Sequence, residues 1–424
     1  MIFGSIIQKL SNSSFLKDSS WALIGSVLGK GLSLLAGIAV ARYLGKDVYG
    51  EYGIIKNTLF QIAVFSTLGL GYTGTRFVAK SIADNTNNTR QIIRSIYVIS
   101  YITSGLLAFL TFLFSNQIAT LIKLPDTSLA IKCTALIIVA NAVNSAQIGI
   151  LSGFKAFKKI AVNNTWGGLV TFISSIGFTY YWGLNGALVA LLISMVFNAI
   201  INNVSIKHHT KEMVVIPDRN PRLYKELIGF SIPVALQESL YSLVGWSISF
   251  LIIEYSNHGE LGLYTAAMQW ANIILFIPGV LKNVILSYFS SSKNTVSLRD
   301  RMIMINVFAT FIPFVFVAIF SSWIASFYGP TFTGLPILLM TSCFASIFSS
   351  VAGVVIYEFI SKGNTWLVFF SRLFRDGSVL VICAILLSTK IIDYPSSFIV
   401  IIVQMAVGVL FAVVMIALVK YKLG

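Results

Sequence analysis

The chain has 424 residues, of which 56% are hydrophobic and only 11% are charged, and its formal net charge is +15. About a quarter of the residues of a soluble domain are charged, so this composition excludes an ordinary water-soluble enzyme. The positive charge does not indicate nucleic acid, because Lys and Arg are spread between long apolar runs and form no single basic face. The sequence therefore predicts an all-α protein that crosses a membrane many times.

Twelve membrane-spanning helices are predicted from apolar runs of about 18 residues or more. Two charge-free runs, 160–206 and 302–357, are too long for one helix, and Gly or Pro residues divide each of them into a pair. The predicted spans are 20–41, 51–75, 95–115, 130–152, 163–182, 186–206, 228–253, 262–287, 303–326, 335–359, 366–388 and 396–419.

The distribution of Lys and Arg predicts the orientation of these spans, because cytoplasmic loops carry an excess of both residues. Twenty lie on one side and four on the other, so both termini and the longest connection, 207–225, are expected in the cytoplasm. The four are Arg42, Lys46, Lys123 and Lys390. The twenty are Lys9, Lys17, Arg76, Lys80, Arg90, Arg94, Lys155, Lys158, Lys159, Lys207, Lys211, Arg219, Arg222, Lys225, Lys293, Arg299, Arg301, Lys362, Lys420 and Lys422.

Two six-helix lobes are expected, because the chain repeats some of its residues after half its length. Six spans are an even number, so the lobes would share one orientation and be related by a pseudo-two-fold axis along the membrane normal. The predicted lobes are 1–206 and 226–424, joined by a cytoplasmic linker at 207–225; residues 1–18 suggest a short amphipathic helix or a disordered tail. A shift of 212 residues aligns Tyr43, Gly50 and Tyr52 with Tyr255, Gly262 and Tyr264.

Several short motifs, in order along the chain, resemble those of polysaccharide and O-antigen flippases. These transporters belong to the multidrug/oligosaccharidyl-lipid/polysaccharide (MOP) exporter superfamily. The corner after the first span, ARYLG at 41–45 and YGEY at 49–52, resembles the signature at that place in the family. The other matching segments are LSGFK at 151–155, GLNGA at 183–187, SIP at 231–233 and GLY at 262–264.

The resemblance implies a twelve-helix, two-lobed MOP/MATE-like transporter. Its substrate would be an undecaprenyl-diphosphate-linked oligosaccharide, flipped across the bacterial inner membrane by alternating access for O-antigen or capsule assembly. Whether H⁺ or Na⁺ drives transport, and whether a polysaccharide polymerase and chain-length proteins are partners, stays open. The alternative is an ion-coupled multidrug exporter of the same architecture. A membrane-embedded glycosyltransferase is disfavoured, because the outer connections are short and no catalytic constellation or nucleotide-binding domain is evident.

Charged residues inside the predicted spans are the candidate transport site, because they are costly in a membrane and usually face a polar interior. Lys30 is roughly 16 Å from either end of its span, and Glu238 is its expected partner in a functional or a structural pair. Five cations against two anions suit an anionic diphosphate head group. The seven residues are Lys30, Lys56, Glu238, Lys282, Arg372, Arg375 and Asp376.

Some of these seven residues have simpler interpretations. Lys56 and Lys282 lie nearer span ends, where they could reach the interface or serve as anchors. Arg372, Arg375 and Asp376 share a helix face, so an Arg372–Asp376 pair is expected to leave Arg375 for the substrate. Aromatic and amide residues could bind sugar rings but are more often packing residues. They are Tyr241, Trp246, Gln269 and Trp270.

No cofactor or metal is expected. Cys133, Cys343 and Cys383 all lie inside apolar runs and are expected to be small buried side chains. The three histidines show no ligand spacing. Glu254 and Glu358, near span ends, are expected to be wetted.

Overall fold

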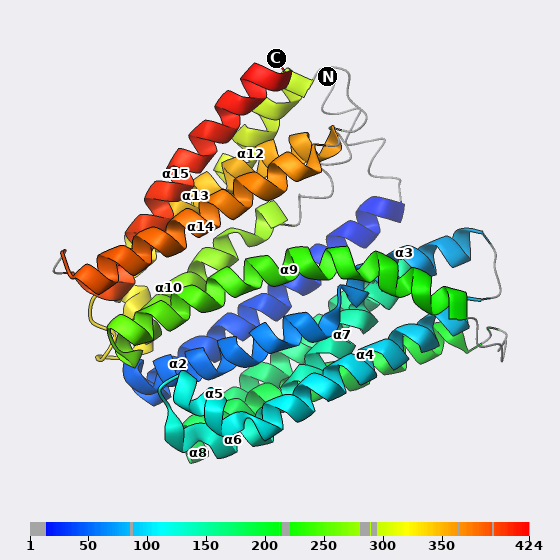
Figure 1. The fold of residues 1–424 in the computed structure, drawn as a ribbon, viewed down its shortest axis with the longest axis horizontal. Helices are drawn as coiled ribbons and strands as arrows, with labels where there is room; N and C mark the ends of the chain where they lie inside the picture. Colours follow the sequence, from blue (N-terminus) through cyan, green and yellow to red (C-terminus); the bar gives the residue numbers. More distant parts are fainter. Residues whose placement is uncertain are drawn as a thin grey trace. The chain divides into compact units, whose positions relative to one another are not determined.

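A computed structural model describes residues 14–84, 88–211, 213, 221–279, 289, 295–362, 364–391 and 394–423, and these residues are almost entirely helical (Figure 1). Within them, seven helical stretches are long and apolar enough to cross a membrane. Two of the seven, Val27–Ile82 and Phe157–Thr210, have 56 and 54 residues, about twice what one crossing needs. With α9 (Pro221–Tyr255), α10 (His258–Ile274) and α14 (Thr365–Thr389), the described helices occupy the places of the twelve predicted spans.

The first predicted pair of spans forms one broken helix and part of the next. Helix α2 (Ser14–Thr67) leaves helical geometry at Gly45, where φ is 71°, a value that glycine adopts without strain. The second span was predicted to continue to residue 75, and that is wrong. Leu68 and Gly69 are left-handed, and α3 (Leu70–Ala83) begins after them.

The rest of the first half contains long helices separated by short ones. Helix α8 covers two predicted spans and breaks at Gly183, where φ is 53°, as the turn residues predict. The fourth span, predicted as one helix, is divided at Ala135 into α6 and α7. The elements are α4 (Thr89–Leu113), α5 (Ser115–Leu121), η1 (Pro125–Thr127), α6 (Ser128–Thr134), α7 (Leu136–Gly153) and α8 (Phe157–Thr210).

The second half is built from six described helices. Most begin or end a few residues beyond the predicted spans. The eighth predicted span, 262–287, reaches past residue 279 into a stretch mostly outside the described residues. The helices are α9 (Pro221–Tyr255), α10 (His258–Ile274), α12 (Thr295–Tyr328), α13 (Leu335–Ser361), α14 (Thr365–Thr389) and α15 (Ser396–Leu423).

Contacts divide the chain into two compact units. The first consists of Met1–Val40 and Ile55–Trp246, and the second of Ala41–Ile54 and Ser247–Gly424. Helices α2 and α9 therefore contribute to both units. The lobe boundaries predicted from the sequence stay a prediction, and most of the linker between them lies outside the described residues.

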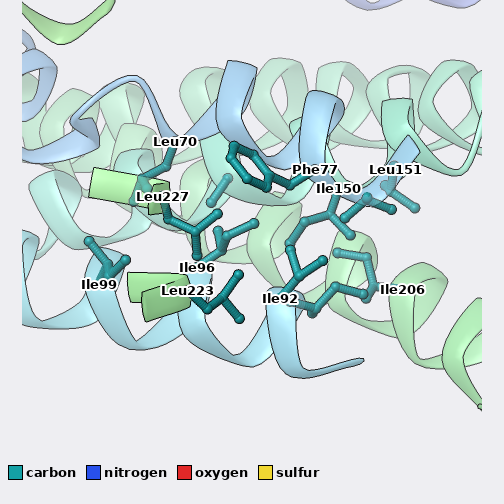
Figure 2. Packing of buried hydrophobic residues seen from close by; sticks show 13 residues of the cluster. Leu70, Phe77, Ile92, Ile96, Ile99, Ile150, Leu151, Ile206, Leu223 and Leu227 are labelled. Carbon is teal, nitrogen blue, oxygen red and sulfur yellow. The ribbon is translucent and has the colours of Figure 1, made fainter. Parts of the chain in front are cut away.

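The core of the first unit lies where α3, α4 and α7 pack together (Figure 2). Apolar residues at helical spacing line the facing sides of these helices, and the start of α9 closes the cluster. Lipid is as apolar as leucine, so close packing stabilises such a core more than exclusion of water does. The labelled residues are Leu70, Phe77, Ile92, Ile96, Ile99, Ile150, Leu151, Ile206, Leu223 and Leu227.

The second unit is organised around α13, which packs against α10, α12 and α15 (Figure 1). Val355 and Phe359 of α13 are fully buried and belong to one cluster with Phe411 and Met415 of α15. This arrangement leaves α14 in contact with α15 and, less extensively, with α13. Helix α14, which carries the predicted site residues Arg372, Arg375 and Asp376, is therefore held in place by α15 and α13.

Candidate transport site

Lys30 lies on α2 with its side chain exposed. The preceding residue, Gly29, meets α8 so closely that a Cβ atom there would be 2.7 Å from the carbonyl oxygen of Asn164. A Cβ atom on Gly168 would in turn be 2.9 Å from the Cα atom of Gly29. Two glycines thus fix this part of α2 against α8, and the ammonium-bearing side chain beside them remains accessible.

Lys56 is half-buried on the second segment of α2. The residues after it are polar: Asn57 is also half-buried, and Thr58 is buried. This segment therefore carries three consecutive polar residues within a predicted span. The choice between a substrate contact and a lysine that reaches the interface stays open for Lys56.

Cross-helix hydrogen bonds join α2 and α3 to α9 within the first unit. The Trp246 indole donates to Thr58 Oγ1 over 3.0 Å, the Ser242 hydroxyl donates to Gln61 Oε1 over 2.5 Å, and the hydroxyls of Thr73 and Ser231 lie 2.6 Å apart. We call these six residues the polar seam. Apart from Trp246, the sequence interpretation missed them. The sequence signal that could have indicated them is the presence of hydroxyl and amide residues at helical spacing inside apolar runs.

On α14, the predicted ion pair is wrong. The carboxylate of Asp376 is engaged by Arg375, whose Nε and Nη2 atoms both lie 2.7 Å from Oδ1, and not by Arg372. The guanidinium carbon of Arg375 also lies 5.1 Å from the ring centre of Phe411, a cation–π distance. Arg372 is half-buried and interacts electrostatically with Tyr357 of α13.

Two predicted site residues cannot be placed with the others. Glu238 lies in helix α9, but its side chain is outside the described residues, as is that of Tyr241. Lys282 lies in the stretch between α10 and α12 that the structure does not describe. The proposed Lys30–Glu238 pair therefore stays a prediction.

Two candidate sugar-binding residues are engaged by other side chains in the second unit. Trp270 donates its indole N–H to the Tyr328 hydroxyl over 3.0 Å. Gln269 accepts a hydrogen bond from the Tyr49 hydroxyl over 3.3 Å. These contacts favour a packing role for both residues.

The corner 41–54 packs tightly on the beginning of α10. A Cβ atom on Gly50 would overlap the carbonyl oxygen of His258, and one on Gly262 would overlap that of Lys46. The amide of Lys46 also donates to Thr331 Oγ1 over 3.2 Å. The two glycines that a shift of 212 residues aligns therefore lie next to each other and allow two backbones to meet.

A buried ion cluster joins α12 to α13. Glu358 was expected to be wetted but is fully buried, and its oxygens lie 3.7 Å from Arg299 Nη1 and 3.7 Å from Lys362 Nζ. The error has a plain cause. The apolar run ends at Tyr357, but α13 continues to Ser361 and α12 starts at Thr295, so both helix ends cover the carboxylate.

The cysteines carry no recognisable site. Cys343 and Cys383 are buried as expected, but Cys133 on α6 is exposed, so the prediction for that residue is wrong. Among the residues that the structure describes, no group of three His, Cys, Asp or Glu side chains could hold a metal ion.

Comparison with known sequences gives a family match and a match to a relative. The model of a family described as "Polysaccharide biosynthesis protein" matches residues 15–293. An uncharacterized membrane protein of Methanocaldococcus jannaschii is 20% identical over 311 residues, which are 70% of this chain and 73% of the relative.

Solved structures of similar fold include transporters with different printed roles. An inward-facing multidrug resistance MATE family transporter of the MOP superfamily has a TM-score of 0.73 at 14% identity, over 95% of this chain and all of that one. The lipid II flippase MurJ, in an inward closed conformation, has a TM-score of 0.76 at 15% identity, over 94% and 87%. A MOP superfamily transporter from Pyrococcus furiosus scores 0.66 at 14% identity, over 95% and 96%. At these identities the likeness establishes the fold alone, and it confirms the predicted MOP architecture.

Proposed function

This chain belongs to the polysaccharide biosynthesis protein family, and from that membership we propose that it is a flippase for a lipid-linked oligosaccharide. In finer detail, it would move an undecaprenyl-diphosphate-linked oligosaccharide across the inner membrane of a bacterium for O-antigen or capsule assembly. The family match over residues 15–293 is the observation that carries the proposal. The architecture shared with a lipid II flippase, a protein named for moving a lipid, supports it.

Charge chemistry supports an anionic head group. Exposed Lys30, half-buried Lys56 and half-buried Arg372 are all cationic, and ammonium and guanidinium groups match phosphate oxygens. Arg375 is held by Asp376, so its charge is largely offset. We assign Lys30, Lys56 and Arg372 to the substrate because their positive charges suit an anionic head group, and Arg375 with Asp376 to the support of α14. Glu238 and Lys282 remain proposed contributors from the sequence.

A reconstitution assay tests the proposal. Purified protein in vesicles should speed the exposure of a lipid-linked oligosaccharide to a glycosidase added outside, compared with vesicles that contain Lys30→Ala protein. A rate equal to that of protein-free vesicles would remove the proposed function. The same vesicles prepared with H⁺ or Na⁺ gradients show whether either ion drives the movement.

A multidrug exporter is the second candidate, because the MATE family transporter shares the fold over all of its own length. Such an exporter would be expected to bind cations through its acidic residues, Glu238 and Asp376. Asp376 is already occupied by Arg375 at 2.7 Å, which disfavours that role. Ion-driven efflux of a cationic dye, lost in Glu238→Gln protein while glycan flipping is absent, would favour the exporter.

Location and partners follow from the proposed function. The protein is a multi-pass membrane protein, and we propose that both termini face the cytoplasm of a bacterial inner membrane. Its binding partners would be the lipid-linked substrate and membrane lipids. A polysaccharide polymerase and chain-length proteins would act on the flipped product on the far side.

A further inference from the structure

Gln61 carries a buried amide donor for which the described residues offer no acceptor. The residue is 6% exposed, and its Oε1 atom accepts a hydrogen bond from the Ser242 hydroxyl over 2.5 Å. Its Nε2 atom, which carries two N–H groups, is buried and has no hydrogen-bond partner among the residues that the structure describes. In a membrane, a donor without an acceptor is costly, because no bulk water can satisfy it.

The other pairs of the polar seam show that helix packing does not need the amide donor of Gln61. The pairs Trp246–Thr58 and Thr73–Ser231 each join the facing helices with a hydrogen bond. A serine or threonine at position 61 could make the same kind of link to Ser242 without a surplus amide. The carboxamide therefore adds a donor at a cost that the seam itself does not require.

Polar residues lie one helical turn before Gln61 on α2. Asn57 lies four residues earlier and Thr58 three residues earlier, so both share a face with Gln61. Asn57 and Lys56 are half-buried. Gln61 therefore has polar neighbours one turn away on α2, and Lys56 lies five residues before it on the same helix.

We propose that the Nε2 amide of Gln61 donates a hydrogen bond to an oxygen of the substrate head group during transport. This inference rests on the proposed flippase function. Diphosphate oxygens and sugar oxygens are both acceptors, so the chemistry alone admits either. Gln61 is a binding residue in this view, and the seam residues Thr58, Ser242 and Trp246 position it.

Two substitutions at one position test the donor. Gln61→Leu removes all hydrogen bonding at similar volume, and Gln61→Glu keeps an acceptor for Ser242 but replaces the amide donors with oxygen. We expect both proteins to flip the lipid-linked oligosaccharide about tenfold more slowly, as loss of one strong hydrogen bond predicts. Gln61→Leu should melt in detergent near the wild-type temperature, because removal of the unmatched donor offsets the loss of the hydrogen bond from Ser242.

Thr73→Val is the matched control, since it breaks the Thr73–Ser231 link in the same seam. We expect this variant to lose thermal stability and to keep its flipping rate. Binding of two purified lipids then identifies the acceptor. Weaker binding of undecaprenyl diphosphate by the Gln61 variants points to a phosphate oxygen, and a loss restricted to the glycan-bearing lipid points to a sugar oxygen.

The outcomes separate this inference from the function on which it rests. Wild-type flipping rates in both Gln61 variants would show that the amide does not contact the substrate and would overturn the inference alone. An inactive wild-type protein would remove the proposed function and this inference together. Poor folding of Gln61→Leu leaves Gln61→Glu to decide, because its carboxylate keeps the contact with Ser242.

Discussion

Arg375 and Asp376 show why neighbouring charges on a helix cannot be paired from spacing alone. Helical spacing places Arg372 and Asp376 one turn apart, which is the usual arrangement of an ion pair. The long side chain of Arg375 instead turns toward its neighbour and places two nitrogen atoms 2.7 Å from one oxygen. The ring of Phe411 on α15 also lies within cation–π distance of that guanidinium, and a contact from another helix is not visible in the sequence of α14.

The observed pairing predicts different effects for two arginine variants. Arg375→Ala leaves the partly buried Asp376 carboxylate without its partner, so we expect a loss of about 1–3 kcal/mol of stability. Arg372→Ala should disturb folding less and slow flipping more. Melting temperatures in detergent and flipping rates per folded protein provide the check, and Arg375→Ala with Asp376→Ala should regain most of the lost stability. A more stable Arg375→Ala than Arg372→Ala protein would contradict the pairing.

Lys30 is the residue on which the transport proposal makes its simplest prediction. Its side chain is exposed, so Lys30→Ala should fold and insert normally while glycan display at the cell surface falls at least tenfold. Lys30→Arg should keep part of the display, because the positive charge remains. Display is measured at matched expression, with Lys155→Ala, an exposed lysine in a predicted cytoplasmic connection, as the control. Normal display by Lys30→Ala cells would reject a substrate role for this lysine.

At the scale of elements, α2 depends on glycines at two kinds of position. Gly45 takes a positive φ and ends the first helical segment. Gly50 lies in the second segment, where the lack of a side chain lets the backbone of α10 approach. The first role follows from the polar corner in the sequence, but the second depends on the neighbouring helix.

Gly50→Ala should be strongly destabilising. The added methyl group would overlap the His258 carbonyl oxygen, so we expect a cost of about 2 kcal/mol or more as the helices separate. Gly105→Ala on α4 is the matched control, since nothing lies within 4 Å of a Cβ atom there. That change should be neutral or raise stability by about 0.5–1 kcal/mol. Equal melting temperatures for the two variants would rule out close packing at Gly50.

The sequence predicted most helices but not all of their limits. Gly183 marks the predicted division of α8, because a turn residue interrupts an apolar run. The break at Leu68 and Gly69 was missed, since both residues lie inside an apolar run that reads as continuous. The polar seam and the burial of Glu358 depend on the register between helices. Periodicity within one helix does not contain that register.

On the scale of the whole molecule, the two compact units do not follow the order of the chain. The corner Ala41–Ile54 belongs to the second unit although the residues on both sides of it belong to the first. Helix α9 belongs to the first unit as far as Trp246 and to the second beyond it. Unfolding of either unit should therefore disturb both of these helices.

The orientation of the chain gives a prediction that needs no transport assay. A reporter active only in the periplasm should give no signal when fused after Lys225 and a strong signal when fused after Asn257. The reason is that α9 would carry the chain from the cytoplasm to the outside. Reporter activity is compared at equal fusion-protein abundance, with a cytoplasm-active reporter at the same two positions as the control. Periplasmic signal at both positions, or at neither, would overturn the twelve-span topology.

The contact between Gly50 and Gly262 has a consequence for how this sequence can change over time. A shift of 212 residues relates the two positions. The backbone of His258 approaches Gly50, and the backbone of Lys46 approaches Gly262. In a symmetric dimer, a residue on the axis meets its own copy, and one mutation alters both sides together. In a single chain the two sides mutate separately. A larger residue on either side has no matching change to accommodate it, so inheritance should preserve this pair of glycines while the sequences around them diverge.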